Sequence, residues 1–148
     1  MAEGSAKSTL IKRLAPLDAV SIESPRTGLG IPDVNFTYGW IECKAMKAWP
    51  KNADTRPVIF PHPLSKEQQV WLYRRERAGG LALVMGKVSN VWFFWSGKKI
   101  KERNLWNNMT RPQMYQEAEK VFTGKLDGPE LIDFVRYLHQ SSASASIS

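Results

Sequence analysis

The chain has 148 residues with a formal net charge of +7, because 21 lysines and arginines outnumber 14 aspartates and glutamates. Its length suits one domain with a sizeable core, and no run of about 18 apolar residues is present to cross a membrane. The single cysteine, Cys43, excludes an internal disulfide framework and a Cys/His zinc site. We therefore expect a soluble, intracellular protein without membrane association, whose charge is compatible with a polyanionic partner.

The N-terminal part of the chain predicts one helix followed by extended segments. The helix spans 7–14 and stops before a proline, and residues 19–23 are extended. Two strands follow at 31–36 and 40–46, and Gly39 between them lets the chain turn. The pattern indicates an antiparallel hairpin.

The middle of the chain predicts a long loop, a helix and two apolar strands. The proline-rich segment 50–63 contains a short strand at 58–60, and its length is typical of a functional loop. A helix follows over 65–79, with Ser65 as its N-cap and Gly79 closing it. Strands at 81–88 and 91–95 complete this part.

The C-terminal part predicts a basic connector, two helices and a tail. Both helices carry proline in their first turn, and the tail is a low-complexity segment expected to be disordered. These segments are 96–103 for the connector, 111–122 and 129–139 for the helices, and 141–148 for the tail. We expect a single α/β domain over 1–140, with a core over about 7–97 and a helical extension over about 104–140.

Three charged residues lie in the predicted hairpin. Glu42 and Lys44 are two residues apart in one strand, so they share a face. Asp33 falls opposite Glu42 if the turn is Thr37–Tyr38 and opposite Lys44 if the turn is one residue later; a three-residue loop would send it to the other face. In the first two registers all three charges lie within about 5 Å across the ladder.

Two facing carboxylates repel each other, and one lysine compensates only in part. A divalent cation would resolve this conflict, since Mg²⁺ commonly takes one or two protein carboxylates and leaves water and phosphate to complete its shell. Such an ion activates water and neutralises charge on a phosphate, and a neighbouring lysine could orient that water. The alternative is a surface hairpin with an ordinary Lys–Glu pair.

The motif Pro32-Asp33 followed by Glu42-Cys43-Lys44 resembles the signature of the PD-(D/E)xK, restriction-endonuclease-like nucleases. The flanking sequence over about 21–97 is similar to the virus-type replication-repair nuclease branch, which includes phage proteins related to Holliday-junction resolvases. The resemblance implies a central mixed β-sheet flanked by helices and a DNA endonuclease dependent on Mg²⁺ or Mn²⁺.

The resemblance also implies roles for individual residues. Asp33, Glu42 and the Cys43 backbone carbonyl would be metal ligands, and Lys44 would act at the water. Relatives often carry another acidic residue on the first helix, which this chain lacks. Glu23 is the nearest stand-in, and its alternative reading is an ordinary loop carboxylate.

Gln68 falls within the apolar stripe of the predicted helix 65–79. That stripe comprises Leu64, Gln68, Trp71, Leu72, Arg75 and Ala78, which should dock on the sheet. A buried amide needs partners. In related nucleases a glutamine at this place leans toward the catalytic site, so Gln68 is a candidate catalytic residue; its alternative is a satisfied structural amide.

Several glycines and basic residues are candidates for DNA contact. Gly28 and Gly30 would let backbone N–H groups approach a phosphate, unless they are simple turn glycines. The basic candidates would bind phosphates without reading sequence, unless they are a solvated surface. They are Arg26, Lys47, Arg74, Arg75, Lys98, Lys99 and Lys101.

Three functions remain open. The leading one is a structure-selective DNA endonuclease similar to junction resolvases, which would act as a homodimer on two strands of a branch. The second is a sequence-specific restriction or homing endonuclease, whose 50–63 loop or C-terminal extension would read bases. The third is a nucleic-acid-binding module that lacks catalysis.

Overall fold

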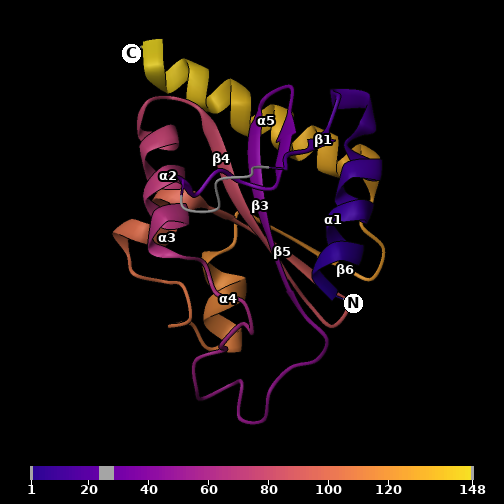
Figure 1. Ribbon diagram of the computed structural model, residues 1–148, viewed down its shortest axis with the longest axis vertical. Coiled ribbons are helices and arrows are strands. Elements are labelled where there is room, and N and C mark those ends of the chain that lie inside the picture. The colour runs from indigo at the N-terminus through magenta and orange to yellow at the C-terminus, as the bar shows by residue number, and fades with distance from the viewer. Residues whose placement is uncertain (1, 24–28, 148) are drawn as a thin grey trace.

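Five α-helices and six β-strands make up the part of the chain that the structure describes (Figure 1). The computed structural model describes the backbone of residues 2–23 and 29–147 and the side chains of residues 4–23 and 29–142. The elements are α1 (Ala2–Arg13), a 3₁₀ turn η1 (Ala15–Leu17), β1 (Val20–Ser21), β2 (Val34–Phe36), β3 (Gly39–Met46), α2 (Lys66–Arg77), β4 (Leu81–Val88), β5 (Val91–Ser96), α3 (Gly97–Glu102), α4 (Arg111–Glu117), β6 (Lys120–Thr123) and α5 (Gly128–Ile147).

The six strands form one mixed sheet in which the spatial order follows the chain order, from β1 to β6. Only β3 and β4 run parallel; the other neighbours are antiparallel. A parallel pair needs a crossover, and α2 supplies it. The helix therefore lies over the strands that it joins, and its first turn comes close to the middle of β3.

The β2–β3 hairpin has a two-residue turn, Thr37–Tyr38. Phe36 lies opposite Gly39 and Val34 lies opposite Ile41. Continued by one residue, this register places Asp33 opposite Glu42. The first of the two predicted registers is therefore the correct one.

Alternation along β3 separates an apolar face from a charged one. Ile41, Cys43 and Ala45 belong to a core that also contains residues of α1 and α5, which cover this face (Figure 1). Glu42 and Lys44 point to the opposite face. There α2, α3, α4 and the loop after β3 build a second core around Phe93 and Trp95. The charged residues thus lie between the sheet and α2.

Two boundaries and one predicted strand in the N-terminal half differ from the prediction. Helix α1 begins at Ala2, earlier than the predicted residue 7, and β2 begins at Val34, three residues late. Residues 58–60 do not form a strand. Their backbone is nevertheless tied down, because Val58 N–H donates to the Met109 carbonyl at 2.8 Å and Phe60 N–H to Asn107 Oδ1 at 3.1 Å.

The C-terminal part is not wholly helical, contrary to the prediction. The basic connector contains a short helix, α3, which Ser96 caps by accepting the Lys99 N–H at 3.1 Å. The predicted helix 111–122 stops at Glu117, and its last residues form β6 on the edge of β5. Helix α5 continues to Ile147, through the segment predicted as a tail.

Within the described residues, no helix is both long and apolar enough to cross a membrane.

Candidate active site

Glu42 and Lys44 are the only charged side chains that are buried among the described residues. Their exposed fractions are 2% and 6%. Burial of a charge is costly unless it is paired and hydrogen-bonded. The Lys44 ammonium lies 3.5 Å from Glu42 Oε2, so the two charges partly compensate each other.

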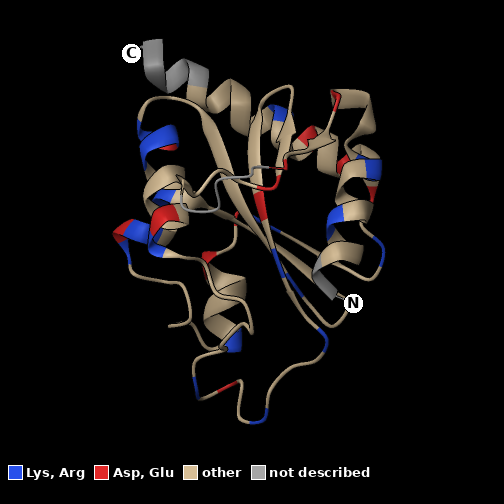
Figure 2. Cartoon of the chain, viewed as in Figure 1, with Lys and Arg blue, Asp and Glu red and all other residues tan. Residues whose placement is uncertain are grey.

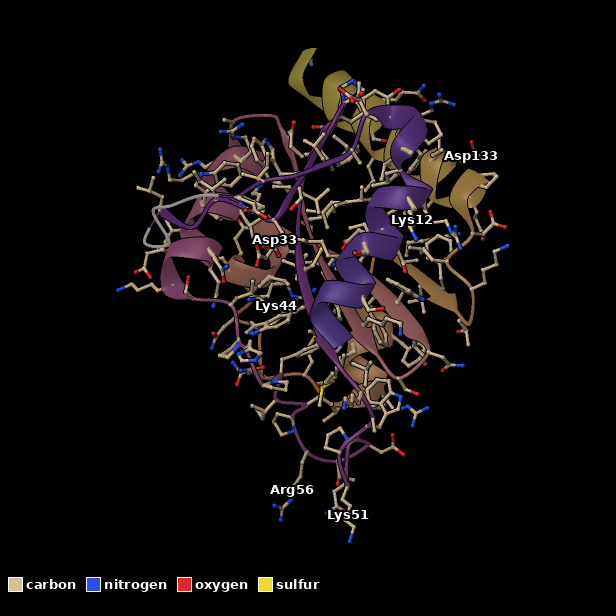
Figure 3. All side chains as sticks on the ribbon, turned by 45° about the vertical axis from the view of Figure 1, so that its right-hand side comes forward. Lys12, Asp33, Lys44, Lys51, Arg56 and Asp133 are labelled. Atoms are coloured by element: carbon tan, nitrogen blue, oxygen red, sulfur yellow. The ribbon has the colours of Figure 1, made fainter. Side chains whose placement is uncertain are left out.

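Asp33 is joined to Glu42 and to the next residue, Cys43, by two hydrogen bonds that cross the hairpin. The Asp33 backbone N–H donates to Glu42 Oε1 at 3.2 Å, and the Cys43 backbone N–H donates to Asp33 Oδ2 at 3.1 Å. The backbone of Asp33 thus positions the Glu42 carboxylate, and the backbone of the residue after Glu42 positions the Asp33 carboxylate. Figure 3 shows Asp33 and Lys44 on the side of β3 that faces α2. The structure brings together the three charges that the sequence placed on one face.

Gln68 completes this cluster from the first turn of α2. Its Nε2 donates to Glu42 Oε2 at 3.0 Å. Its Oε1 accepts the Ser65 backbone N–H at 2.9 Å, while the Gln68 N–H donates to Ser65 Oγ at 3.0 Å. This reciprocal pair is a capping box, which fixes where α2 begins. Gln68 therefore links the start of the helix to the buried carboxylate.

The surroundings of Glu42 favour its protonated form. Burial, followed by the neighbouring Asp33 carboxylate, raises the pKa of Glu42 to about 8, although Lys44 opposes the shift. Without a further cation, the Glu42 carboxyl would retain its proton at neutral pH. A bound cation beside Glu42 would favour the ionised carboxylate, as the opposite charge of Lys44 does.

The oxygen atoms available in this cluster are of the type that a hard divalent cation prefers as ligands. Asp33 and Glu42 supply two carboxylates, the number that Mg²⁺ commonly takes from a protein. In an extended strand the N–H and C=O of one residue point to the same edge, so the Cys43 carbonyl faces the edge where its N–H meets Asp33. The site accordingly offers oxygen ligands from β3 and from the residue that precedes β2.

Glu23 is not brought into this site. It is exposed, and the described residues contain no group of three His, Cys, Asp or Glu side chains that could hold a metal ion. The backbone beside it pairs with the hairpin, because Ile22 N–H donates to the Asp33 carbonyl at 2.7 Å. The metal role predicted for Glu23 therefore has no support in the geometry.

This chain matches no known protein family, no curated protein and no solved structure.

Gly30 lies where close packing against α2 by itself calls for glycine. It is buried with φ +76°, and a Cβ there would lie 2.4 Å from the Glu67 carbonyl oxygen and 2.8 Å from the Gln68 nitrogen. Glycine is thus required because the chain packs against the first turn of α2. Arg26 and Gly28, also predicted to contact DNA, lie outside the described residues.

Of the residues predicted to form the buried face of α2, only those up to Leu72 are buried or partly buried. Leu64 and Leu72 are buried, whereas Arg75 and Ala78 are exposed. The Arg75 guanidinium lies over Trp71, 4.4 Å from its ring centroid, and 5.7 Å from the ring of Trp40. Arg75 therefore covers aromatic rings at the edge of the interface instead of docking on the sheet.

The remaining basic candidates differ in what they contact. Lys99 Nζ lies 2.7 Å from Glu119 Oε1 and also donates to the Glu117 carbonyl, so its charge serves the fold. Lys47, Arg74 and Lys101 are exposed, and Lys98 is partly exposed. Sequence reasoning could not separate Lys99 from the others, because its partners are 18 and 20 residues away.

Sequence reasoning missed two features of the site. It identifies Ser65 as an N-cap but not the reciprocal bond that the Ser65 N–H donates to Gln68 Oε1, for which the spacing Ser-x-x-Gln is the signal. The second feature is the pair formed by Trp40 and Trp71, whose ring centroids are 5.2 Å apart at 69°. Trp40 shares the face of Glu42, since the two are two residues apart on β3.

Proposed function

We propose that this chain is a metal-dependent DNA endonuclease that selects its substrate by structure. The observation that carries this proposal is a single hydrogen-bonded cluster of Asp33, Glu42, Lys44 and Gln68 in which two ionisable side chains, Glu42 and Lys44, are buried. A purely structural hairpin gains little from burying an ion pair, because desolvation offsets the attraction. A catalytic site, in contrast, needs such groups held in place.

Each residue has a role that follows from its position. Asp33 and Glu42 would hold Mg²⁺ or Mn²⁺, which when bound supplies an activated water and neutralises charge on a phosphate. Lys44 presents its ammonium beside Glu42, where it can orient the attacking water or stabilise a developing negative charge. Gln68 holds the Glu42 carboxylate in one orientation, which is the usual task of a residue behind a metal ligand.

The fold and the charge are consistent with the resemblance seen in the sequence. A mixed sheet flanked by helices is what that resemblance implies, and here β3 carries Glu42 and Lys44 at its centre. The net charge of +7 and the exposed arginines of α2 suit a phosphate backbone. A homodimer acting inside the cell on branched DNA is the form of this activity that we propose.

The test is cleavage of four DNA substrates with and without Mg²⁺. The substrates are linear duplex, flap, four-way junction and single-stranded DNA, incubated with the wild type, Asp33→Asn and Glu42→Gln. We expect Mg²⁺-dependent cleavage that either substitution abolishes while DNA binding persists. Asp133→Asn is the matched control, because this exposed carboxylate lies on α5, on the other side of the sheet (Figure 3).

Ca²⁺ should bind without supporting turnover, since its larger and looser shell positions water less well. Undiminished cleavage by Asp33→Asn or Glu42→Gln would refute the metal assignment. Cleavage at one fixed sequence, whatever the DNA shape, would assign the protein to sequence-specific endonucleases. Binding without cleavage of any of the four substrates would favour a non-catalytic binding module.

A further inference from the structure

A hollow of about 510 Å³ lies along the C-terminal half of α2. One indole, one phenol and three guanidinium groups line it. The lining residues are Trp71, Tyr73, Arg74, Arg75, Arg77 and Ala78. This volume falls within the range of about 300–1,000 Å³ that is typical of ligand pockets. Figure 2 shows the positive charge of α2 at the same side of the molecule as that of α3.

A second hollow of about 320 Å³ lies beside it, toward the start of the helix. Lys66, Val70 and Leu29 contribute to its lining, and Glu67 is its one acidic residue. Trp71 and Arg74 line both hollows, so they form the ridge between them. The two hollows thus share one indole ring and one guanidinium group, with further cationic side chains around them.

The indole of Trp71 is held in a fixed position. The Arg75 guanidinium lies over it at 4.4 Å from the ring centroid, and the Trp40 ring meets it edge to face. A ring that is already immobilised loses little conformational entropy when a ligand stacks against it. An aromatic ring surrounded by arginines also has the composition of sites that bind unpaired nucleotides.

The hollows begin beside the candidate active site. Trp71 follows Gln68 by three residues, a rise of about 4.5 Å along the helix. On the sheet, Trp40 precedes Glu42 by two residues and lies on the same face. Both partners of the aromatic pair are therefore neighbours of residues in the hydrogen-bonded cluster.

We propose that these hollows bind an unpaired nucleotide of the DNA substrate. Its base packs against the pair formed by Trp71 and the Arg75 guanidinium that lies over it, and the adjoining phosphates lie against Arg74, Arg77 and Lys66. A base within a duplex is already stacked on both faces and cannot make this contact. The inference rests on the proposed function and deepens it, since it names the feature of the DNA that is recognised: a single-stranded stretch or branch next to the cleaved phosphate.

The experiment measures binding in the absence of metal, so it does not depend on catalysis. Fluorescein-labelled DNA is titrated with protein in EDTA, using a single strand, the blunt duplex of the same sequence and that duplex with a single-stranded flap. The variants are Trp71→Leu, which keeps an apolar side chain in the interface, and Arg74→Ala, which removes an exposed guanidinium. The control is Arg136→Ala on α5, which removes the same charge from an exposed position on another helix.

We expect the wild type to bind the single strand and the flap more tightly than the blunt duplex. Trp71→Leu should weaken binding to these two by about five- to a hundredfold, the range typical of alanine substitution at one stacked base, and leave the blunt duplex unaffected. Arg74→Ala should weaken binding, and the slope of log affinity against log salt concentration should become smaller in magnitude by about 1. Arg136→Ala should change neither.

Two results would overturn the proposal. One is equal affinity of the wild type for the single strand and the blunt duplex. The other is an unchanged preference in both Trp71→Leu and Arg74→Ala, with their melting temperatures near that of the wild type. If Trp71→Leu unfolds, Arg74→Ala decides alone, and its binding must weaken more than that of Arg136→Ala. Retained metal-free preference without cleavage would reject the proposed enzyme while supporting the binding site.

Discussion

Gln68→Leu separates the two tasks that this amide performs. The substitution removes the bond to Glu42 Oε2 and also the capping bond that Ser65 N–H donates to Gln68 Oε1. Ser65→Ala is the matched variant, because it removes the other half of the capping box and leaves the Gln68–Glu42 bond in place. Comparison of the two therefore isolates the contact to the carboxylate.

The expected magnitudes follow from these contacts. Loss of a side-chain cap costs about 0.5–2 kcal/mol of stability, and each kcal/mol shifts the melting temperature of a protein of this size by about 2–4 °C. Both variants should thus melt a few degrees lower than the wild type. Loss of the residue that orients a metal ligand typically costs about 10–100-fold in metal affinity or activity, and only Gln68→Leu should show this loss.

The assay combines thermal melting with cleavage at increasing Mg²⁺ concentration. Gln68→Leu should cleave more slowly at every concentration or need more Mg²⁺ for half-maximal rate, whereas Ser65→Ala should stay close to the wild type in both respects. A well-folded Gln68→Leu variant with the full rate would refute the positioning role. Equal losses in the two variants would show that the capping box alone accounts for the effect.

Two further predictions concern pH and Gly30. Because the pKa of Glu42 is about 8 in the folded chain against an ordinary 4.5, the folded state retains a proton that the unfolded chain releases between these values. The melting temperature in EDTA should therefore fall as pH rises through this window, and Glu42→Gln should make this fall smaller. Part of the pH dependence should remain in that variant, because burial also raises the pKa of Glu76. Gly30→Ala should lower stability by about 1–3 kcal/mol and slow cleavage, because its Cβ meets the first turn of α2. Gly124→Ala, with φ +81° and open space, is the control that carries only the backbone strain; a similar loss in both would contradict the packing argument.

Local rules were sufficient for the parts of the site that depend on one or two neighbouring strands. Alternation placed Glu42 and Lys44 on one face, and a two-residue turn placed Asp33 opposite Glu42. Helical periodicity placed Gln68 toward the sheet. Each of these follows from a short stretch of chain, and for that reason the candidate cluster could be predicted before the fold was known.

Features that depend on distant partners could not be predicted in this way. Residues 120–123 follow a helix without a break in composition, and only the free edge of β5 selects a strand there. Lys99 belongs to a basic run, yet its carboxylate partners come from the segment before β6. Gly30 has no local signal that distinguishes a turn from close packing against α2. In each case tertiary contacts override a local preference.

The pairing of β6 with β5 bears on how short this domain can be made. A chain truncated near residue 97 would contain every residue of the candidate cluster, but it would leave β5 as an open edge with the sequence Val-Trp-Phe-Phe-Trp. Such an apolar edge invites pairing with another molecule, and its aromatic rings would also lose the cover of α4 and α5. The last third of the chain therefore protects the sheet from aggregation, and a smaller version would need a new edge strand or charged gatekeeper residues in its place.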